Sequence, residues 1–145
     1  AKGVVETVKK LNWAPDIIHV HGWMASLLPL YLRSFYKEEP LFTESKIVTS
    51  LYNSGFEGEL NNELKNKIKF DLDEKEKLSI LEKPNHTNIL KSAIENSDAI
   101  IRASESISEE LESYIKDTEK PVLNYEAENI KESYLNFYAE LLSAE

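Results

Sequence analysis

Four short apolar runs, separated by stretches with a helical spacing of apolar residues, constrain the fold of this 145-residue chain more than any other feature. Most of these runs are rich in β-branched residues. We interpret them as strands at 16–20, 46–52 and 98–103, with a fourth starting at Pro121. Strands that alternate with helices predict a parallel sheet, because parallel strands need long crossover connections. We therefore expect one α/β domain over residues 1–145, with a three-layer, Rossmann-like parallel sheet covered by helices on both faces.

Helices are predicted between these strands from the spacing of apolar residues. The predicted helices cover 4–11, 23–35, 109–116 and 130–142, with another that begins near Asn85. Pro29 lies inside the second of them and predicts a kink or a restart there, and Asn85 or His86 is a suitable cap for the later helix. The charge-rich segment 61–83 is interpreted as a solvated face carrying one or two exposed helices, and the apolar stripe over 134–142 as core.

Charge and composition exclude several classes of partner. The chain has 26 Asp and Glu against 17 Lys and Arg, which gives a net charge of -9. A net negative charge repels nucleic-acid phosphates and anionic lipid, so neither nucleic acid nor a membrane is expected as a partner. The sequence contains no cysteine, which excludes disulfides and cysteine-based metal sites, and a cytoplasmic location is expected by default.

In parallel α/β sheets, ligands bind at the loops that follow the carboxyl ends of the strands. Here those loops are predicted at 19–24, 52–58 and 103–106. None of them contains a G-x-S-x-G nucleophile elbow, a G-x-G-x-x-G turn or a P-loop, so the sequence indicates no hydrolase site of that type and no cofactor site.

Two histidines, His19 and His21, lie two residues apart and would share one face of the first strand. Such a pair can begin a zinc site, but a third ligand is hard to name. Cysteine is absent, the only other histidine is the remote His86, and Asp16 lies at the other end of the strand. We therefore favour hydrogen-bonded histidines over a metal site.

Aromatic and polar residues in the first two loops suit a hydroxyl-rich ligand. Trp23 offers a flat surface on which a sugar ring can lie, although it can equally be the first core residue of its helix. Asn53, Phe56 and Glu57 lie on one turn, "YNSGFEG", which also fits an ordinary surface loop. Both alternatives fit the sequence.

Three segments, taken in order, resemble the N-terminal lobe of bacterial glycogen synthases and plant starch synthases. "PDIIHVHGWMASLLPLYL" resembles that family's P-D-[IV]-[IV]-H-x-H-D-W-H-[TA]-[AG]-L-x-P-x-[YL]-L, and "IVTSLYNSGFEG" is similar to its V-x-T-[IV]-H-N-x-x-Y-Q-G. "ILKSAIENSDAIIRASESISEEL" is similar to a later segment, L-K-x-[GA]-[IL]-x-x-[AS]-D-x-[IV]-x-T-V-S-x-x-Y-x-x-E. The resemblance covers residues 9–111.

The resemblance implies a glucosyltransferase that moves glucose from ADP-glucose or UDP-glucose to the non-reducing end of an α-1,4-glucan, with the anomeric configuration kept. It further implies that an N-terminal lobe contacts the acceptor glucan, while a second lobe and a K-x-G-G loop hold the sugar-nucleotide. Neither is found in this sequence, so we expect the chain to be the later part of one lobe. A lobe without its opening strands exposes a sheet edge, through which homo-oligomers can form.

Three positions depart from the family pattern where the chemistry is expected. Carried over residue by residue, the acidic residue of H-D-W falls on Gly22, and the histidine two further on falls on Met24. The catalytic-site histidine of the H-N dipeptide falls on Tyr52. Neither a glycine nor a neutral phenol supplies the charge or the proton transfer expected there. The resemblance places acceptor-glucan contacts on His21, Trp23, Asn53, Phe56 and Glu57.

Three interpretations follow from this pattern. The first is a glycogen synthase-like glucosyltransferase lobe that is inactive by itself. The second is a catalytically inactive relative that binds α-glucan or regulates another protein, and the third is a structural domain whose crevice holds no ligand.

Overall fold

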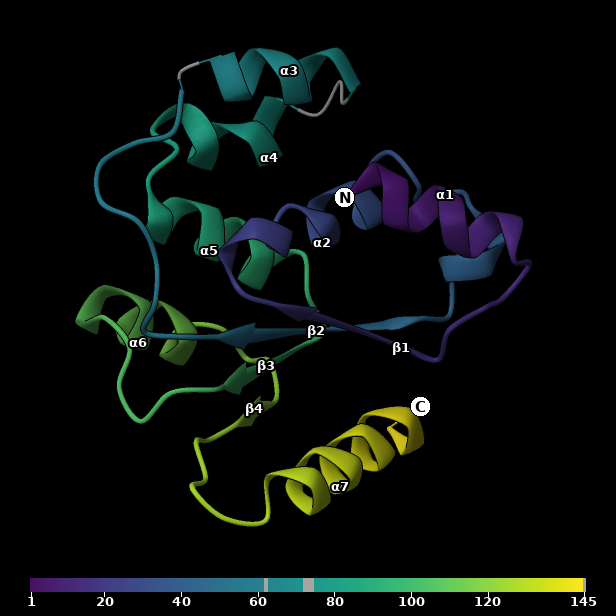
Figure 1. Cartoon of the computed structure of the whole chain (residues 1–145), viewed down its shortest axis with the longest axis vertical. Coiled ribbons are helices and arrows are strands. Elements are labelled where there is room, and N and C mark those ends of the chain that lie inside the picture. Colours follow the sequence, from purple (N-terminus) through teal and green to yellow (C-terminus); the bar gives the residue numbers. More distant parts are fainter. Residues whose placement is uncertain (62, 72–74, 145) are drawn as a thin grey trace.

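The computed structural model describes residues 1–61, 63–71 and 75–144 and contains a four-stranded parallel sheet (Figure 1). The strands lie in chain order as β1 (Ile17–His21), β2 (Lys46–Leu51), β3 (Ala99–Arg102) and β4 (Val122–Leu123). Ile17 pairs with Lys46, Val48 with Ala99, and Ile100 with Val122. The outer side of β1 has no strand partner within the described residues. The predicted α/β class with a parallel sheet is confirmed.

Helices cover both faces of the sheet. α1 (Lys2–Lys10), α2 (Leu28–Arg33), α5 (His86–Glu95) and α6 (Glu109–Lys116) lie on one face, and α7 (Ile130–Ser143) lies alone on the other (Figure 1). α3 (Glu63–Asp71) and α4 (Lys75–Ser79) lie farther from the sheet, beyond α5 (Figure 1). Within the described residues, 3-10 turns cover Trp23–Ala25, Pro40–Phe42 and Ile80–Glu82. Within the described residues no helix combines the length and the apolar character needed to cross a membrane.

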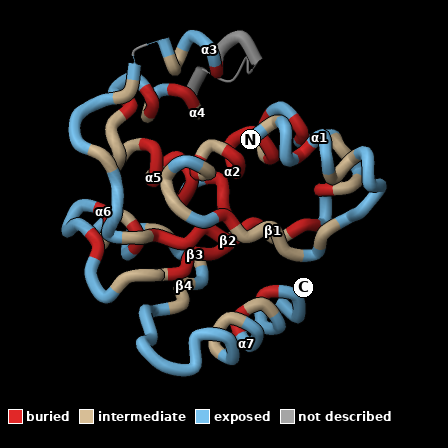
Figure 2. The backbone as a smooth tube through the Cα atoms, in the orientation of Figure 1, coloured by how far each residue is buried: buried red, intermediate tan, exposed pale blue. Residues whose placement is uncertain are grey.

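The core follows the alternation of side chains along the strands, which sends neighbouring residues to opposite faces. Leu51 and Ile100 pack with α5 and α6, whereas Val48 and Ile101 pack against α7. β2 and β3 are the most completely buried segments of the sheet (Figure 2).

The predicted core stripe at the C-terminal end is confirmed in part. Phe137 and Leu141 of α7 are buried against the sheet, and Tyr134 and Tyr138 pack beside them. Leu142 is 42% exposed, so the prediction is wrong for that residue. A single helix above a sheet buries only the stripe that faces the strands, and Leu142 lies outside that stripe.

Local sequence signals determine where two helices begin. The side chain of Asn85 accepts a hydrogen bond from the backbone N–H of Asn88 at 2.8 Å, which is the predicted cap of α5. The first 3-10 turn ends at Ala25, and α2 then starts at Leu28 with Pro29 in its first turn. Proline is accepted at that position because its missing N–H would have no partner there, so the predicted restart is confirmed.

The interpretation of 61–83 as a purely solvated face is wrong for three residues. Ile68, Leu78 and Leu81 are no more than 2% exposed and pack with Leu30 of α2 and Ile89 of α5. Residues 62 and 72–74 of this segment lie outside the described residues. Isolated apolar residues among many charges produce a weak periodic signal, yet each can still bury its side chain against α5.

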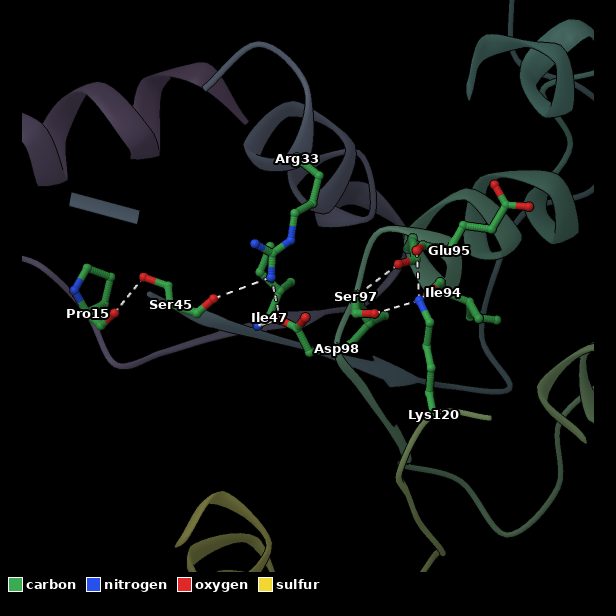
Figure 3. Close-up of polar contacts among 11 residues, drawn as sticks. Pro15, Arg33, Ser45, Ile47, Ile94, Glu95, Ser97, Asp98 and Lys120 are labelled. Atoms are coloured by element: carbon green, nitrogen blue, oxygen red, sulfur yellow. Dashed lines mark hydrogen bonds and ion pairs between the residues drawn. The ribbon is translucent and has the colours of Figure 1, made fainter. Parts of the chain in front are cut away.

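Ionic contacts fasten the amino ends of the strands (Figure 3). One carboxylate oxygen of Asp98 accepts hydrogen bonds from the Arg33 guanidinium at 2.5 Å and from the backbone N–H of Ile47 at 2.6 Å. The Lys120 ammonium donates to three backbone carbonyl oxygens at the end of α5, those of Ile94, Glu95 and Ser97, at 2.7, 2.7 and 2.6 Å. A cation at a helix C-terminus stabilises the otherwise unpaired carbonyl groups, so Lys120 joins α5 to the start of β4.

Candidate functional site

The carboxyl edge of the sheet brings the three predicted loops together. His21 ends β1 and Tyr52 follows β2, and the His21 Nδ1 atom lies 2.9 Å from the Tyr52 hydroxyl. The backbone N–H of Asn53 donates to the Ser104 hydroxyl of the third loop at 3.0 Å. Loops from β1, β2 and β3 therefore meet at one edge, as expected for parallel strands.

The two histidines of β1 stack on each other, with ring centroids 3.8 Å apart. Both ring nitrogens of His19 are hydrogen bonded: Nδ1 to the Tyr138 hydroxyl of α7, and Nε2 to the Ser50 hydroxyl at 2.6 Å. Burial, and secondarily the neighbouring His21, lower the pKa of His19 to about 4, and burial also lowers the pKa of His21. The prediction of hydrogen-bonded histidines is confirmed. No three His, Asp or Glu side chains in the described part of the chain are grouped so that they could hold a metal ion.

A pocket of about 300 Å³ opens beside these loops. Its walls come from the loop after β2 and from the first turns of α5 and α6, where Asn85 and Ser108 are the caps. The lining residues are Tyr52, Asn53, Gly55, Phe56, Glu57, His86, Thr87, Ser108 and Leu111. Hydroxyl, amide and carboxylate groups beside two aromatic rings suit a ligand that carries both hydroxyl groups and apolar faces.

The five residues predicted to contact glucan divide into two groups. Asn53, Phe56 and Glu57 line the pocket. Trp23 and His21 are not among the described residues that line it, and the Trp23 ring instead packs on Phe56, with centroids 4.7 Å apart. Trp23 is half-buried against the core beneath α5 and α6, which favours the core alternative for this residue. Of the aromatic residues, Phe56 and Tyr52 line the pocket.

Gly22 has a backbone conformation that the acidic residue expected at this position by the resemblance would adopt only with strain. Its φ is 71° and its ψ is 164°, a region that is essentially restricted to glycine. A side chain at this position would meet no atom within 4 Å, so the constraint is the backbone rather than space. An acidic residue at position 22 would therefore require a different turn after β1. Met24, two residues later, is 82% exposed.

Tyr52, where the resemblance expects a histidine, carries a phenol. Burial, together with the nearby Tyr134, raises the pKa of Tyr52 above its ordinary value. Its hydroxyl is bonded to His21 Nδ1. A phenol that stays neutral near pH 7 cannot exchange protons as an imidazole does.

His86 is a pocket residue that the sequence analysis considered only as a possible cap or a remote metal ligand. It is the first residue of α5, and its ring packs edge-on against Phe56 with centroids 5.7 Å apart. About 30 residues separate His86 from the loop after β2, and no sequence pattern joins them.

Comparison with known proteins places the chain in a family. Residues 1–124 match the family described as starch synthase catalytic domain. A glycogen synthase of Chlorobium luteolum is 33% identical over 109 residues, which is 75% of this chain and 22% of that protein. A glycogen synthase of Clostridium perfringens is 32% identical over 111 residues, 76% of this chain and 23% of that protein.

The match does not extend over the whole length of either protein. The chain spans less than a quarter of the length of these curated relatives, and α7 lies beyond the residues that match the family. No solved structure matches the chain. The resemblance of the three motifs and the family match agree, and the chain belongs to the starch synthase catalytic domain family.

Proposed function

We propose that this chain is the later part of the N-terminal lobe of a glycogen or starch synthase-like glucosyltransferase, and that its carboxyl edge binds the acceptor α-glucan. In the whole enzyme, glucose would pass from ADP-glucose or UDP-glucose to the end of an α-1,4-glucan in the cytoplasm. Family membership supports the reaction class, because the relatives are named glycogen synthases.

The observation that carries the proposal is the composition of the pocket at the carboxyl edge. Phe56 offers an aromatic face, and Asn53 and Glu57 offer an amide and a carboxylate on the same turn. A glucose ring has an apolar face and a rim of hydroxyl groups, so it can stack on an aromatic ring while its hydroxyls bond to such groups. The pocket volume of about 300 Å³ is at the lower end of the range of small-molecule sites and suits one or two sugar units.

A second candidate is a catalytically inactive relative that binds α-glucan or regulates another protein. The backbone at Gly22 favours it, because that turn is built for glycine and presents no carboxylate to a developing positive charge. The neutral phenol of Tyr52 at the family's histidine position points the same way. Removal of one group that stabilises a transition state commonly costs a factor of ~10² to 10³ in rate.

The test is a calorimetric titration of the chain with maltoheptaose and, separately, with ADP-glucose, followed by a transferase assay with glycogen. We expect weak binding of maltoheptaose and no glucose incorporation by this chain alone. Replacement of the pocket aromatic, Phe56→Ala, should abolish sugar binding. Phe35→Ala, an exposed phenylalanine away from the pocket, is the matched control and should leave binding unchanged.

The outcomes test the glucan site, which both candidates share, and the expected inactivity of this chain alone. Sugar binding without incorporation supports the acceptor surface, and measurable incorporation would refute the expectation that this chain is inactive alone. A flat titration with folded protein up to millimolar maltoheptaose would overturn the proposed glucan site and favour a structural domain.

A further inference from the structure

His86 lies beneath the loop that carries the proposed glucan contacts. The backbone of Gly55 rests on the imidazole ring: a Cβ atom built on Gly55 would lie 2.6 Å from both Cδ2 and Nε2 of His86. The neighbouring Phe56 ring packs edge-on against the same imidazole. A side chain at position 55 would overlap the ring, so the close packing of the loop on His86 depends on glycine at this position.

The same loop is held to the start of α5 at its far end. The backbone N–H of Leu60 donates to the carbonyl oxygen of Pro84 at 3.0 Å, and Glu59 forms an antiparallel bridge with Asn85. The loop is therefore anchored at residues 59–60, while residues 53–57 form the pocket wall over His86.

One nitrogen of the His86 ring has no partner. Among the residues that the structure describes, His86 Nε2 and Ser92 Oγ are the side-chain polar atoms buried without a hydrogen bond. Burial lowers the pKa of His86, which favours the neutral ring. A neutral imidazole carries one N–H and one acceptor nitrogen, and Nε2 can serve as that acceptor.

A buried acceptor without a donor is unfavourable, and a donor that reaches it gains the full benefit of the new hydrogen bond. The backbone of Gly55 lies beside His86 Nε2, and His86 is one of the residues that line the pocket. A hydroxyl group on a ligand in the pocket is a donor of suitable size, and it can reach Nε2 if residue 55 moves aside.

We propose that His86 is a further ligand-contacting residue of this pocket, and that its Nε2 accepts a hydrogen bond from a hydroxyl group of the bound α-glucan when the loop lifts at Gly55. The inference rests on the proposed function, since it assumes that a hydroxyl-rich ligand occupies the pocket. It assigns His86 a role beyond the capping and metal-ligand roles weighed from the sequence.

The first experiment follows the imidazole nitrogens of ¹⁵N-histidine-labelled chain by NMR during a titration with maltoheptaose. We expect the His86 Nε2 resonance to shift with the same midpoint as the amide resonances of the pocket loop. Because this measurement uses the unaltered sequence, it does not depend on the folding of a variant.

The second experiment compares affinities by calorimetry. His86→Phe keeps a ring beneath Gly55 but removes the acceptor, and it should weaken maltoheptaose binding about five- to tenfold, the value of one hydrogen bond. His86→Gln keeps an acceptor oxygen and should bind more tightly than His86→Phe. Ser92→Ala removes the other unpaired buried atom, on the same helix but outside the pocket lining, and should leave the affinity unchanged.

The outcomes distinguish this inference from the proposed function. If maltoheptaose shifts the loop amides while His86 Nε2 stays unchanged and His86→Phe binds normally, the role of His86 is overturned and the glucan site stands. Equal weakening by Ser92→Ala would also overturn it, because the loss would then act through the helix. If maltoheptaose does not bind at all, both fall.

Discussion

Acidification should weaken the folded state through His19 of β1, whose ring bonds to residues of β2 and α7. Both of its ring nitrogens are bonded, to Ser50 and to Tyr138, and His21 stacks on it. Protonation would place a charge in a partly buried site beside a second imidazole, so the folded state disfavours it. Burial, with a smaller contribution from His21, lowers the pKa to about 4, against an ordinary value of 6.5.

The sign and size of the effect follow from these two values. Because the folded-state pKa is depressed, the histidine binds its proton more readily in the unfolded chain. Its contribution to stability is complete above pH 6.5 and is lost as the pH falls from 6.5 toward 4. The shift corresponds to at most about 3.4 kcal/mol. Since the ring is partly exposed, solvent screening reduces this, and we expect about 2 kcal/mol.

The assay is urea unfolding, followed by circular dichroism, at several pH values between 7.5 and 4.5. Carboxylates also titrate in this range, so His19→Gln serves as the reference: an amide keeps a donor and an acceptor for Ser50 and Tyr138 but does not titrate. The difference in unfolding free energy between the two proteins isolates His19. We expect the original chain to lose about 2 kcal/mol more than the variant at the acid end. Parallel curves would refute the reasoning.

Three substitutions test other features of the structure. Gly22→Ala should lower the free energy of unfolding by about 1 to 3 kcal/mol in a denaturant titration, because φ is 71° and ψ is 164° at this position. Gly3→Ala, inside α1, is the control and should be neutral or slightly stabilising. Equal effects of the two substitutions would contradict the backbone argument. Lys120→Met removes three hydrogen bonds at the end of α5 and should cost about 1 to 2 kcal/mol, with faster amide exchange in the last turn of that helix; an unchanged unfolding midpoint would contradict it. Gly55→Ala should destabilise the chain because its Cβ would overlap the His86 ring, and His86→Ala should relieve that cost in the double variant; purely additive effects would show that the contact is unimportant.

Most of the sheet could be predicted because each strand is marked by a pattern within a short stretch of sequence. The β-branched runs at β1, β2 and β3 are each bounded by turn residues, and the helix caps at Asn85 and Ser108 depend on one side chain and a nearby N–H. Pro29 predicts the restart of α2 from local sequence too, because its missing N–H affects hydrogen bonding only within one helical turn.

What could not be predicted depends on contacts between distant segments. The burial of Leu78 results from packing against α5, and a charge-rich sequence conceals it. Whether Trp23 faces a ligand or the core depends on where Phe56 lies, more than 30 residues away. The place of His86 beneath Gly55 likewise requires the loop and α5 to meet in space.

The strand order also bears on how the chain acquires its fold. Each strand pairs with the strand that immediately precedes it in the sequence, from β1 to β4. A sheet of this kind can grow one strand at a time as the polypeptide leaves the ribosome, without waiting for a distant partner. α7 instead packs back across β2 and β3, which precede it by many residues, and places Phe137 and Leu141 over the sheet. Until α7 packs there, this apolar face of the sheet is uncovered.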